Sequence, residues 1–183
     1  MNTYKGNNIQ GWMHDVELQF LYEEMLKLPR TAKVVEVGSW KGKSGHALAS
    51  GLRDIDSFDT LYCIDTFKGA LTNPTQMEQA IKDNPLEEIR KNLREFNVNI
   101  LVSDSAVAAN EFEKESIDFL FLDANHDYEY VIKDIDAWLP KIKPGGIICG
   151  HDYREHYKGV KQAVDEKFSG VKTFPDSIWY FNG

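Results

Sequence analysis

The chain has no excess of basic residues and no long apolar run. Its 183 residues include 21 Lys and Arg against 29 Asp and Glu, which gives a formal net charge of −8 at pH 7. Broad binding to nucleic acid or to an anionic membrane needs a basic face, so this charge disfavours both kinds of partner. We also expect no membrane insertion, because no stretch is apolar enough and long enough to span a bilayer.

Cysteine is scarce, and a signal-peptide pattern is missing. The only two cysteines, Cys63 and Cys149, lie in apolar segments that are typical of buried, reduced thiols. The polar N-terminal segment lacks the apolar core of a signal peptide. These features predict a cytoplasmic protein. The length favours one domain over residues 1–183, with an N-terminal helical cap over residues 1–30.

Three common site patterns are also missing. The five histidines do not follow HExxH or HxxxH spacing, which argues against a zinc hydrolase. Lys43 and Ser44 do not follow the glycine spacing of a phosphate-binding loop. The chain also has no Gly-x-Gly-x-x-Gly pattern, which weighs against a dinucleotide site.

Apolar runs alternate with helical patterns along the chain. The runs are continuously apolar, which is typical of parallel strands buried on both faces. Predicted strands cover residues 33–37, 60–65, 98–102, 117–122 and 146–150, and predicted helices cover residues 16–29, 43–52, 86–96, 105–113, 128–139 and 158–168. The alternation predicts an α/β fold with a doubly wound, mostly parallel, Rossmann-like sheet.

Three further segments complete the prediction. Residues 171–174 and 177–182 flank a short Pro-Asp-Ser turn, so we expect an antiparallel C-terminal hairpin that brings the sheet to seven strands. Residues 140–146, PKIKPGG, are predicted as a structural turn. Residues 69–88 are a polar insertion with two prolines, either a solvated surface loop or a mobile lid over a ligand crevice.

The segment KVVEVGSWKGKSG, residues 33–45, passes from a strand through a glycine turn into a helix. Such a turn presents backbone N–H groups to a nucleotide-like ligand. Gly38 permits a tight turn, and Gly42 permits close approach of a ligand to the backbone. Glu36 disfavours a phosphate there but suits a ligand with hydroxyls and an ammonium group. Glycines that serve only turn geometry are the alternative.

Each predicted parallel strand brings an acidic side chain to its carboxyl end. These side chains are Glu36, Asp65, Asp104, Asp123 and Asp152. Ligands of open parallel sheets bind beyond these strand ends, where Asp65 is placed to hold ribose hydroxyls or, alternatively, to cap the next segment. Neighbouring carboxylates repel one another, so we expect a cationic ligand, sugar hydroxyls or a metal ion to offset their charge.

Asp123, His151 and Asp152 follow two strands that we expect to be neighbours. Two carboxylates and an imidazole could hold a hard divalent cation, Mg²⁺ or Mn²⁺. His126 and Tyr153 lie nearby in the sequence as candidate acid–base groups. Alternatively, Asp152 caps a turn and His151 packs beneath a loop.

Seven motifs in this order resemble class I S-adenosylmethionine-dependent methyltransferases, in particular the small-molecule O-methyltransferases of the macrocin and cephamycin-related group. They are GWM at 11–13, VVEVGSWKGKS at 34–44, IDTFKG at 64–69, Asp104-Ser105, FLDANHDYE at 121–129, AWLPKIKPGG at 137–146 and GHDY at 150–153. Some relatives carry Asp-Asp where this chain has His151-Asp152. Since a neutral imidazole suits softer metals, the identity of the metal stays open.

The resemblance implies a role for each site residue. The amino-acid part of S-adenosylmethionine would meet Glu36, Gly38 and Ser39, the ribose would meet Asp65, and the adenine would lie beside Asp104 and Ser105. The full expected cofactor set is Glu36, Gly38, Ser39, Gly42, Ser44, Asp65, Thr66, Asp104, Ser105 and Asp123. The expected catalytic residues are Asp123, His126 and His151, and the expected metal ligands are Asp123, His151 and Asp152.

The resemblance implies methyl transfer to a small-molecule acceptor, by expectation a hydroxyl that loses its proton to Asp123, to His126 or with help from a metal. Self-association into a homo-oligomer is compatible with the sequence. Two other functions stay open. One is a nicotinamide-dependent oxidoreductase, since Glu36 and Asp65 could serve a dinucleotide, and the other is a catalytically silent binding protein of the same fold.

Overall fold

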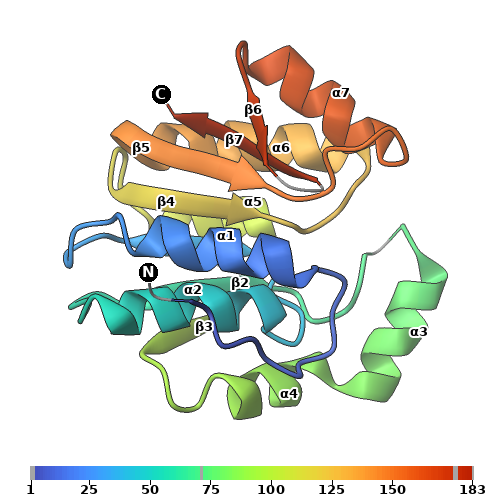
Figure 1. Cartoon of the computed structure of the whole chain (residues 1–183). Coiled ribbons are helices and arrows are strands. Elements are labelled where there is room, and N and C mark those ends of the chain that lie inside the picture. Colours follow the sequence, from blue (N-terminus) through green and yellow to red (C-terminus); the bar gives the residue numbers. More distant parts are fainter. Residues whose placement is uncertain (1–2, 71, 175–176, 183) are drawn as a thin grey trace.

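A seven-stranded sheet forms the centre of the protein (Figure 1), whose computed structural model describes residues 3–70, 72–174 and 177–182. The strands lie in the order β3-β2-β1-β4-β5-β7-β6. They are β1 (Val34–Val37), β2 (Leu61–Asp65), β3 (Val98–Val102), β4 (Ile117–Leu122), β5 (Ile142–Gly150), β6 (Lys172–Phe174) and β7 (Ile178–Asn182). The pairs among β1 to β5 are parallel, whereas β7 is antiparallel to both β5 and β6.

The expected α/β architecture is therefore confirmed, including the C-terminal hairpin. The predicted turn residues Pro175 and Asp176 of that hairpin lie outside the described residues. The helices are α1 (Asp15–Met25), α2 (Lys43–Asp54), α3 (Pro74–Asp83), α4 (Pro85–Asn92), α5 (Ser105–Ala108), α6 (Tyr128–Trp138) and α7 (Lys158–Lys167), with short 3₁₀ turns at Ala109–Glu111 and Leu139–Lys141.

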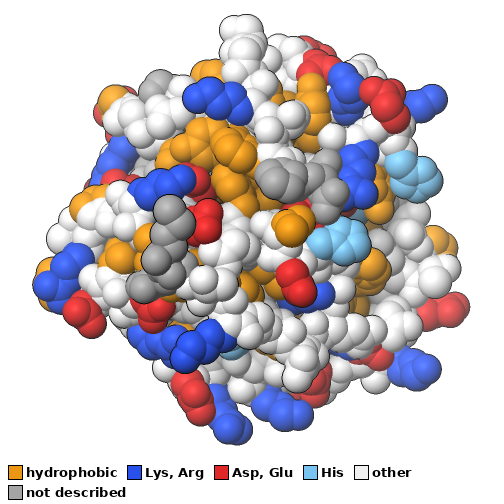
Figure 2. Space-filling view, in the orientation of Figure 1, with side chains coloured by type: hydrophobic (Ala, Val, Ile, Leu, Met, Phe, Trp, Pro, Cys, Tyr) orange, Lys and Arg blue, Asp and Glu red, His pale blue; other side chains and the backbone are white. Residues whose placement is uncertain are grey.

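Both faces of the sheet are covered, which explains why its strands are continuously apolar. On β1, Val34 packs in one core with residues of α1 and α2, whereas Val35 and Val37 pack in a second core with residues of α5, α6 and α7. In Figure 1, α1 and α2 lie in front of the sheet and α6 lies behind it. On the front face, acidic and basic side chains are interspersed around a group of hydrophobic side chains (Figure 2).

Two predicted segments have a different structure. β5 begins at Ile142, so the prediction of a turn over residues 140–146 was wrong for most of that segment. Ile142 pairs with Ile117 of β4 before the register shifts, and Gly145 takes a positive φ of 77° within the strand. This early start depends on pairing with a distant segment, which the local turn composition does not reveal.

The insertion at residues 69–88 is largely helical rather than an irregular loop. Pro74 and Pro85 occupy the first turns of α3 and α4, where proline is favoured because the first helical N–H groups have no partner within the helix. Asn84 joins the two helices in the left-handed conformation, with φ 46°. Leu71 of this insertion lies outside the described residues.

Two contacts tie the insertion to the edge toward which β4 and β5 point, where α3 lies in Figure 1. Asn125, in the loop after β4, donates to Thr72 Oγ1 at 3.2 Å. Lys41, in the glycine turn, forms an ion pair with Asp83, and its Nζ also donates to Gln10 Oε1 at 2.6 Å. The buried Lys41 side chain thus joins α3, the turn and the N-terminal segment.

No described helix combines the length and apolar composition that a membrane crossing requires.

We predict that Asp83→Asn loosens α3, because Lys41 would lose its only carboxylate partner among the described ion pairs. Hydrogen exchange of the α3 backbone should become several-fold faster, while β4 and β5 keep their protection. The control is Glu87→Gln on α4, whose partner Arg90 is exposed, so that pair contributes little. Equal α3 exchange in the parent and Asp83→Asn would show that this ion pair does not hold the helix.

Candidate active site

Backbone hydrogen bonds bring four strand ends to one edge of the sheet. The N–H of Gly38 donates to the carbonyl of Ile64 at 2.8 Å, and the N–H of Asp123 donates to the carbonyl of Val37 at 2.8 Å. The N–H of His151 donates to the carbonyl of Leu122 at 3.1 Å. The prediction that β4 and β5 are adjacent strands is therefore confirmed. Residues at the carboxyl ends of β1, β2, β4 and β5 meet at this edge.

The glycine turn after β1 has a backbone that requires both of its glycines. Gly38 has a φ of 91°, and a Cβ on it would lie 2.0 Å from the carbonyl oxygen of Asp123. Gly42 has a φ of 85°, and its Cβ would lie 2.9 Å from the side chain of Ile89 on α4. Gly42 therefore allows close packing of α4, and its expected role in the approach of a ligand stays a prediction.

Glu36 is fully buried at the end of β1. Burial raises the pKa of its carboxyl, and the nearby Ser39 and Ser44 hydroxyls oppose this rise only in part. Within the described chain, neither oxygen of Glu36 nor the Ser39 hydroxyl oxygen has a partner at hydrogen-bond geometry. A buried oxygen without a hydrogen-bond partner costs folding free energy. These three oxygens therefore stand out as acceptors that a ligand beside the turn could satisfy.

Asp65 connects the end of β2 to the glycine turn. Its Oδ2 accepts from the N–H of Trp40 at 2.8 Å, and its Oδ1 accepts from the N–H of Phe67 at 2.7 Å. Burial raises the pKa of Asp65, although these two N–H groups oppose the rise. A carboxylate has about four acceptor positions, so Asp65 can accept further hydrogen bonds from a ligand.

Asp104, Ser105 and Thr66 take local roles in the structure. Asp104 caps α5 by accepting from the N–H groups of Ala106 and Val107. The Ser105 hydroxyl accepts from the indole N–H of Trp138 at 2.9 Å, and Thr66 Oγ1 accepts from the N–H of Lys68 at 3.3 Å. Their expected roles at a cofactor stay predictions.

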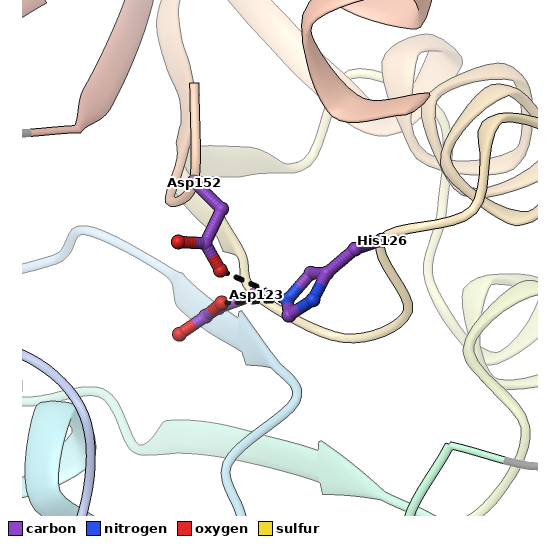
Figure 3. A group of neighbouring side chains, drawn as sticks. All are labelled: Asp123, His126 and Asp152. Atoms are coloured by element: carbon purple, nitrogen blue, oxygen red, sulfur yellow. Dashed lines mark ion pairs between the residues drawn. The ribbon is translucent and has the colours of Figure 1, made fainter. Parts of the chain in front are cut away.

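Asp123, His126 and Asp152 converge beyond the ends of β4 and β5 (Figure 3). His126 Nε2 lies 3.0 Å from Asp152 Oδ2 and 3.7 Å from Asp123 Oδ1. One ligand atom from each of the three residues lies within 4.8 Å of the others, so the group could hold a metal ion. The sequence had placed His126 among the catalytic candidates rather than among the metal ligands.

His151 lies beside the same carboxylates but is also bonded to a residue that sequence reasoning missed. Its Nδ1 is 3.3 Å from Asp152 Oδ1 and 3.7 Å from Asp123 Oδ1, while its Nε2 is 2.9 Å from Glu17 Oε1 on α1. Glu17 is fully buried. The available signal was its helical spacing, since Glu17 shares the buried side of α1 with Leu21 and Glu24.

The Tyr153 hydroxyl donates to Asp165 on α7. The expected acid–base role of Tyr153 stays a prediction.

The two imidazoles balance the acidic side chains. Burial would lower the pKa of His126, but Asp123 and Asp152 outweigh it and raise this pKa to about 9. Burial also lowers the pKa of His151. Asp123, Asp152 and Glu17 outweigh this effect and raise the pKa of His151 to about 10. Despite burial, the same two imidazoles hold the pKa of Asp152 well below its usual range. Without a cation, this edge is therefore an internally neutralised cluster.

A small cavity of about 20 Å³ lies beneath the cluster, between Asp123, His126, His151 and Asp134 of α6. This volume holds about one water molecule. A larger surface cavity of about 640 Å³ lies between the N-terminal segment and α1, and the described residues that line it include none of the predicted site residues.

Comparison with known proteins identifies the family. A family model described as Methyltransf_24, methyltransferase domain, matches residues 35–153, which is more than half of the chain. The chain belongs to this methyltransferase family. The match begins in β1, continues through the glycine turn and Asp123, and ends just after Asp152. The expected methyltransferase class is therefore confirmed.

Solved structures share the fold of this methyltransferase. The O-methyltransferase NovP has a TM-score of 0.70 and 20% identity, with 91% of this chain and 78% of that chain covered. SAH-bound PaMTH1 from Podospora anserina has a TM-score of 0.59 and 16% identity, with 92% and 78% covered. A SAM-dependent O-methyltransferase from Thermotoga maritima has a TM-score of 0.62 and 15% identity, with 93% and 66% covered.

A curated relative is much longer than this methyltransferase chain. It is the uncharacterized protein y4gI of Sinorhizobium fredii (strain NBRC 101917 / NGR234), which is 27% identical over 135 residues. Those residues are 73% of this chain but only 14% of that protein.

Asp134 of the methyltransferase offers a test of the electrostatics beneath the site. Burial raises its pKa to about 6, with a hydrogen bond from Ser105 opposing the rise. Between the unfolded pKa and pH 6, folding takes up a proton, so the free energy of unfolding falls as pH rises. Above pH 6, the ionised Asp134 costs about 3 kcal/mol of stability by this linkage.

We therefore predict that Asp134→Asn raises the melting temperature by several degrees at pH 8, with the gain shrinking toward pH 4. Melting followed by circular dichroism across this pH range measures the effect. The control is Asp136→Asn on the same helix, whose half-exposed side chain pairs with Lys167. A gain for Asp134→Asn that does not vary with pH would contradict the linkage.

Proposed function

We propose that this methyltransferase transfers a methyl group from S-adenosylmethionine to a hydroxyl group of a small-molecule acceptor. The observation that carries the proposal is the glycine turn held by Asp65, directly beside the Asp123–His126–Asp152 group, in a chain of the methyltransferase family. NovP and the Thermotoga maritima protein, which share this fold, are described as O-methyltransferases, and PaMTH1 was solved with SAH.

The residues at the turn suit S-adenosylmethionine. Asp65 keeps free acceptor positions for ribose hydroxyls, and the unpaired Ser39 and Glu36 oxygens supply hydrogen-bonding capacity next to the turn. Because Glu36 is enclosed, we expect it to act through Ser39 and Ser44 rather than by touching the cofactor. Gly38, Gly42, Thr66, Asp104, Ser105 and Asp123 complete the proposed cofactor set.

The chemistry at the edge follows from its charges. The bound cofactor supplies an electrophilic methyl group on a sulfonium, and the protein has to orient the acceptor and take its proton. With both imidazoles protonated, the carboxylates are the groups able to accept that proton. Asp123 has the more accessible side chain, 21% exposed against 10% for Asp152, so we assign it the base role.

His126 then has a second role. Its protonated imidazole lies beside Asp123 and can stabilise negative charge that develops on the acceptor oxygen. A divalent cation held by Asp123, His151 and Asp152 would serve the same purpose as a Lewis acid. Assistance from a metal is thus part of the proposal, and in its absence Asp123 takes the proton with the protonated His126 beside it.

We predict that Asp65→Asn weakens binding of S-adenosylhomocysteine about 10- to 100-fold, because a charge-assisted hydrogen bond to the ribose is lost. Calorimetry measures the dissociation constant, and methyl transfer is assayed alongside it. Asp59→Asn is the matched control, since Asp59 precedes the opposite end of β2 and accepts from the N–H of Thr60.

Unchanged affinity in Asp65→Asn would refute the ribose assignment. Tight binding by the parent chain without turnover on any hydroxylated acceptor would instead support the silent binding protein. Preferential binding of NAD would support the oxidoreductase.

We also predict that the α3–α4 segment acts as a lid. It contacts both the glycine turn and the loop after β4, so a ligand at this edge should reduce its local opening. Hydrogen exchange of residues 72–92 should slow when S-adenosylhomocysteine is added, with α7 as the internal reference. The same protection with and without ligand would leave the insertion as an ordinary surface element.

A further inference from the structure

Glu17 has no role in the proposed methyl transfer, yet it is a fully buried carboxylate at the reacting edge. Figure 1 shows that α1, which carries Glu17, begins on the side where β4 and β5 end. Glu17 Oε1 lies 2.9 Å from His151 Nε2 and accepts from the Ser177 hydroxyl at 3.1 Å. Its Oε2 accepts from the N–H of His14 at 2.8 Å, and Arg154 Nη2 lies 3.7 Å from Oε1. These contacts fix the position of the carboxylate.

The bond to Glu17 determines which nitrogen of His151 faces the site. Because Nε2 is bonded to Glu17, Nδ1 is the nitrogen that faces Asp123 and Asp152, at 3.7 and 3.3 Å. An imidazole with one nitrogen bonded to a carboxylate and the other directed at further ligands is the usual arrangement of a histidine that binds a metal. The carboxylate fixes the ring orientation and makes the other nitrogen a better ligand.

The spacing of the surrounding donor atoms also suits a cation. The four nitrogen-to-oxygen distances that link His126 and His151 to Asp123 and Asp152 lie between 3.0 and 3.7 Å. Adjacent ligands bound about 2.1 Å from one ion lie roughly 3.0–3.5 Å apart. Asp123, His126 and Asp152 each offer one donor atom within 4.8 Å of the others. The bond to Glu17 turns Nδ1 of His151 toward the same two carboxylates, as a fourth donor beside this group.

We propose that Glu17 is a positioning residue that presents His151 to the Asp123–His126–Asp152 group, so that these side chains form a site for a transition-metal cation rather than for Mg²⁺. Binding of the ion displaces the ring protons that face the carboxylates, and the ion then takes the place of the protonated His126 in the proposed chemistry. The proposal rests on the proposed function only in placing the reaction at this edge. Imidazole nitrogen suits ions such as Co²⁺ and Zn²⁺, whereas Mg²⁺ prefers oxygen ligands. Two imidazoles among four side chains thus shift the preference away from Mg²⁺.

The test is metal binding measured directly, without turnover. The full chain is stripped with a chelator and titrated by calorimetry with CoCl₂ and separately with MgCl₂, and the visible absorption of Co²⁺ reports nitrogen ligation. We expect one tight Co²⁺ site with nitrogen ligands and weaker binding of Mg²⁺. Glu17→Gln should weaken Co²⁺ binding about 10- to 100-fold, as the loss of an outer partner of a metal-binding histidine does.

Two further variants make the result specific. Glu23→Gln makes the same change on the exposed side of α1 and should leave the Co²⁺ affinity unchanged. His151→Asp replaces one imidazole with a carboxylate and should narrow the difference in affinity between Co²⁺ and Mg²⁺. This second variant keeps the proposal testable if Glu17→Gln fails to fold, which circular dichroism shows.

Three outcomes would overturn the proposal: no Co²⁺ site, Mg²⁺ bound as tightly as Co²⁺, or a folded Glu17→Gln variant with parental Co²⁺ affinity. The first would mean that the imidazoles neutralise the acids without any metal. Titration of the same samples with S-adenosylhomocysteine measures cofactor binding independently of metal binding. Cofactor binding without a Co²⁺ site refutes this inference alone, whereas absence of cofactor binding refutes the proposed function.

Discussion

The close backbone contact between the ends of β1 and β4 is the constraint on which the rest of the site depends. Any side chain at Gly38 would collide with the carbonyl of Asp123, at 2.0 Å from the Cβ. With glycine there, Asp123 can bond to the carbonyl of Val37 and lie next to the turn that Asp65 holds. One backbone requirement therefore places the proposed cofactor turn and the proposed base side by side.

Charge balance is the second constraint, and this chain meets it with imidazoles. Carboxylates at neighbouring strand ends repel one another, and burial adds a desolvation cost. His126 and His151 sit between Asp123 and Asp152 and lower the pKa of Asp152 below its usual range. The imidazoles thus offset the repulsion between the carboxylates, and the donor atoms of His126, Asp123 and Asp152 lie within 4.8 Å of one another.

The sequence predicted those parts of the site that follow directly from a strand. Asp65 and Asp123 each end a continuous apolar run, and such runs identify parallel strands whose carboxyl ends meet. Glu17 could not be predicted in the same way, because it lies 134 positions from His151 and meets it only through packing of α1 on the sheet. α3 was missed although Asn73 and Pro74 carry an ordinary helix start signal, since proline was interpreted only as a breaker.

Glu17 also shows how a helix outside the matched family region enters the site. A buried carboxylate on the apolar side of α1 costs stability unless its partners offset desolvation, and His151 is the largest of the influences that lower its pKa. The family match starts only at residue 35, after α1 has ended. The ring orientation of His151 therefore depends on a segment that the family pattern does not specify. Within a common fold, the chemistry at this edge can change through such a helix while the glycine turn stays the same.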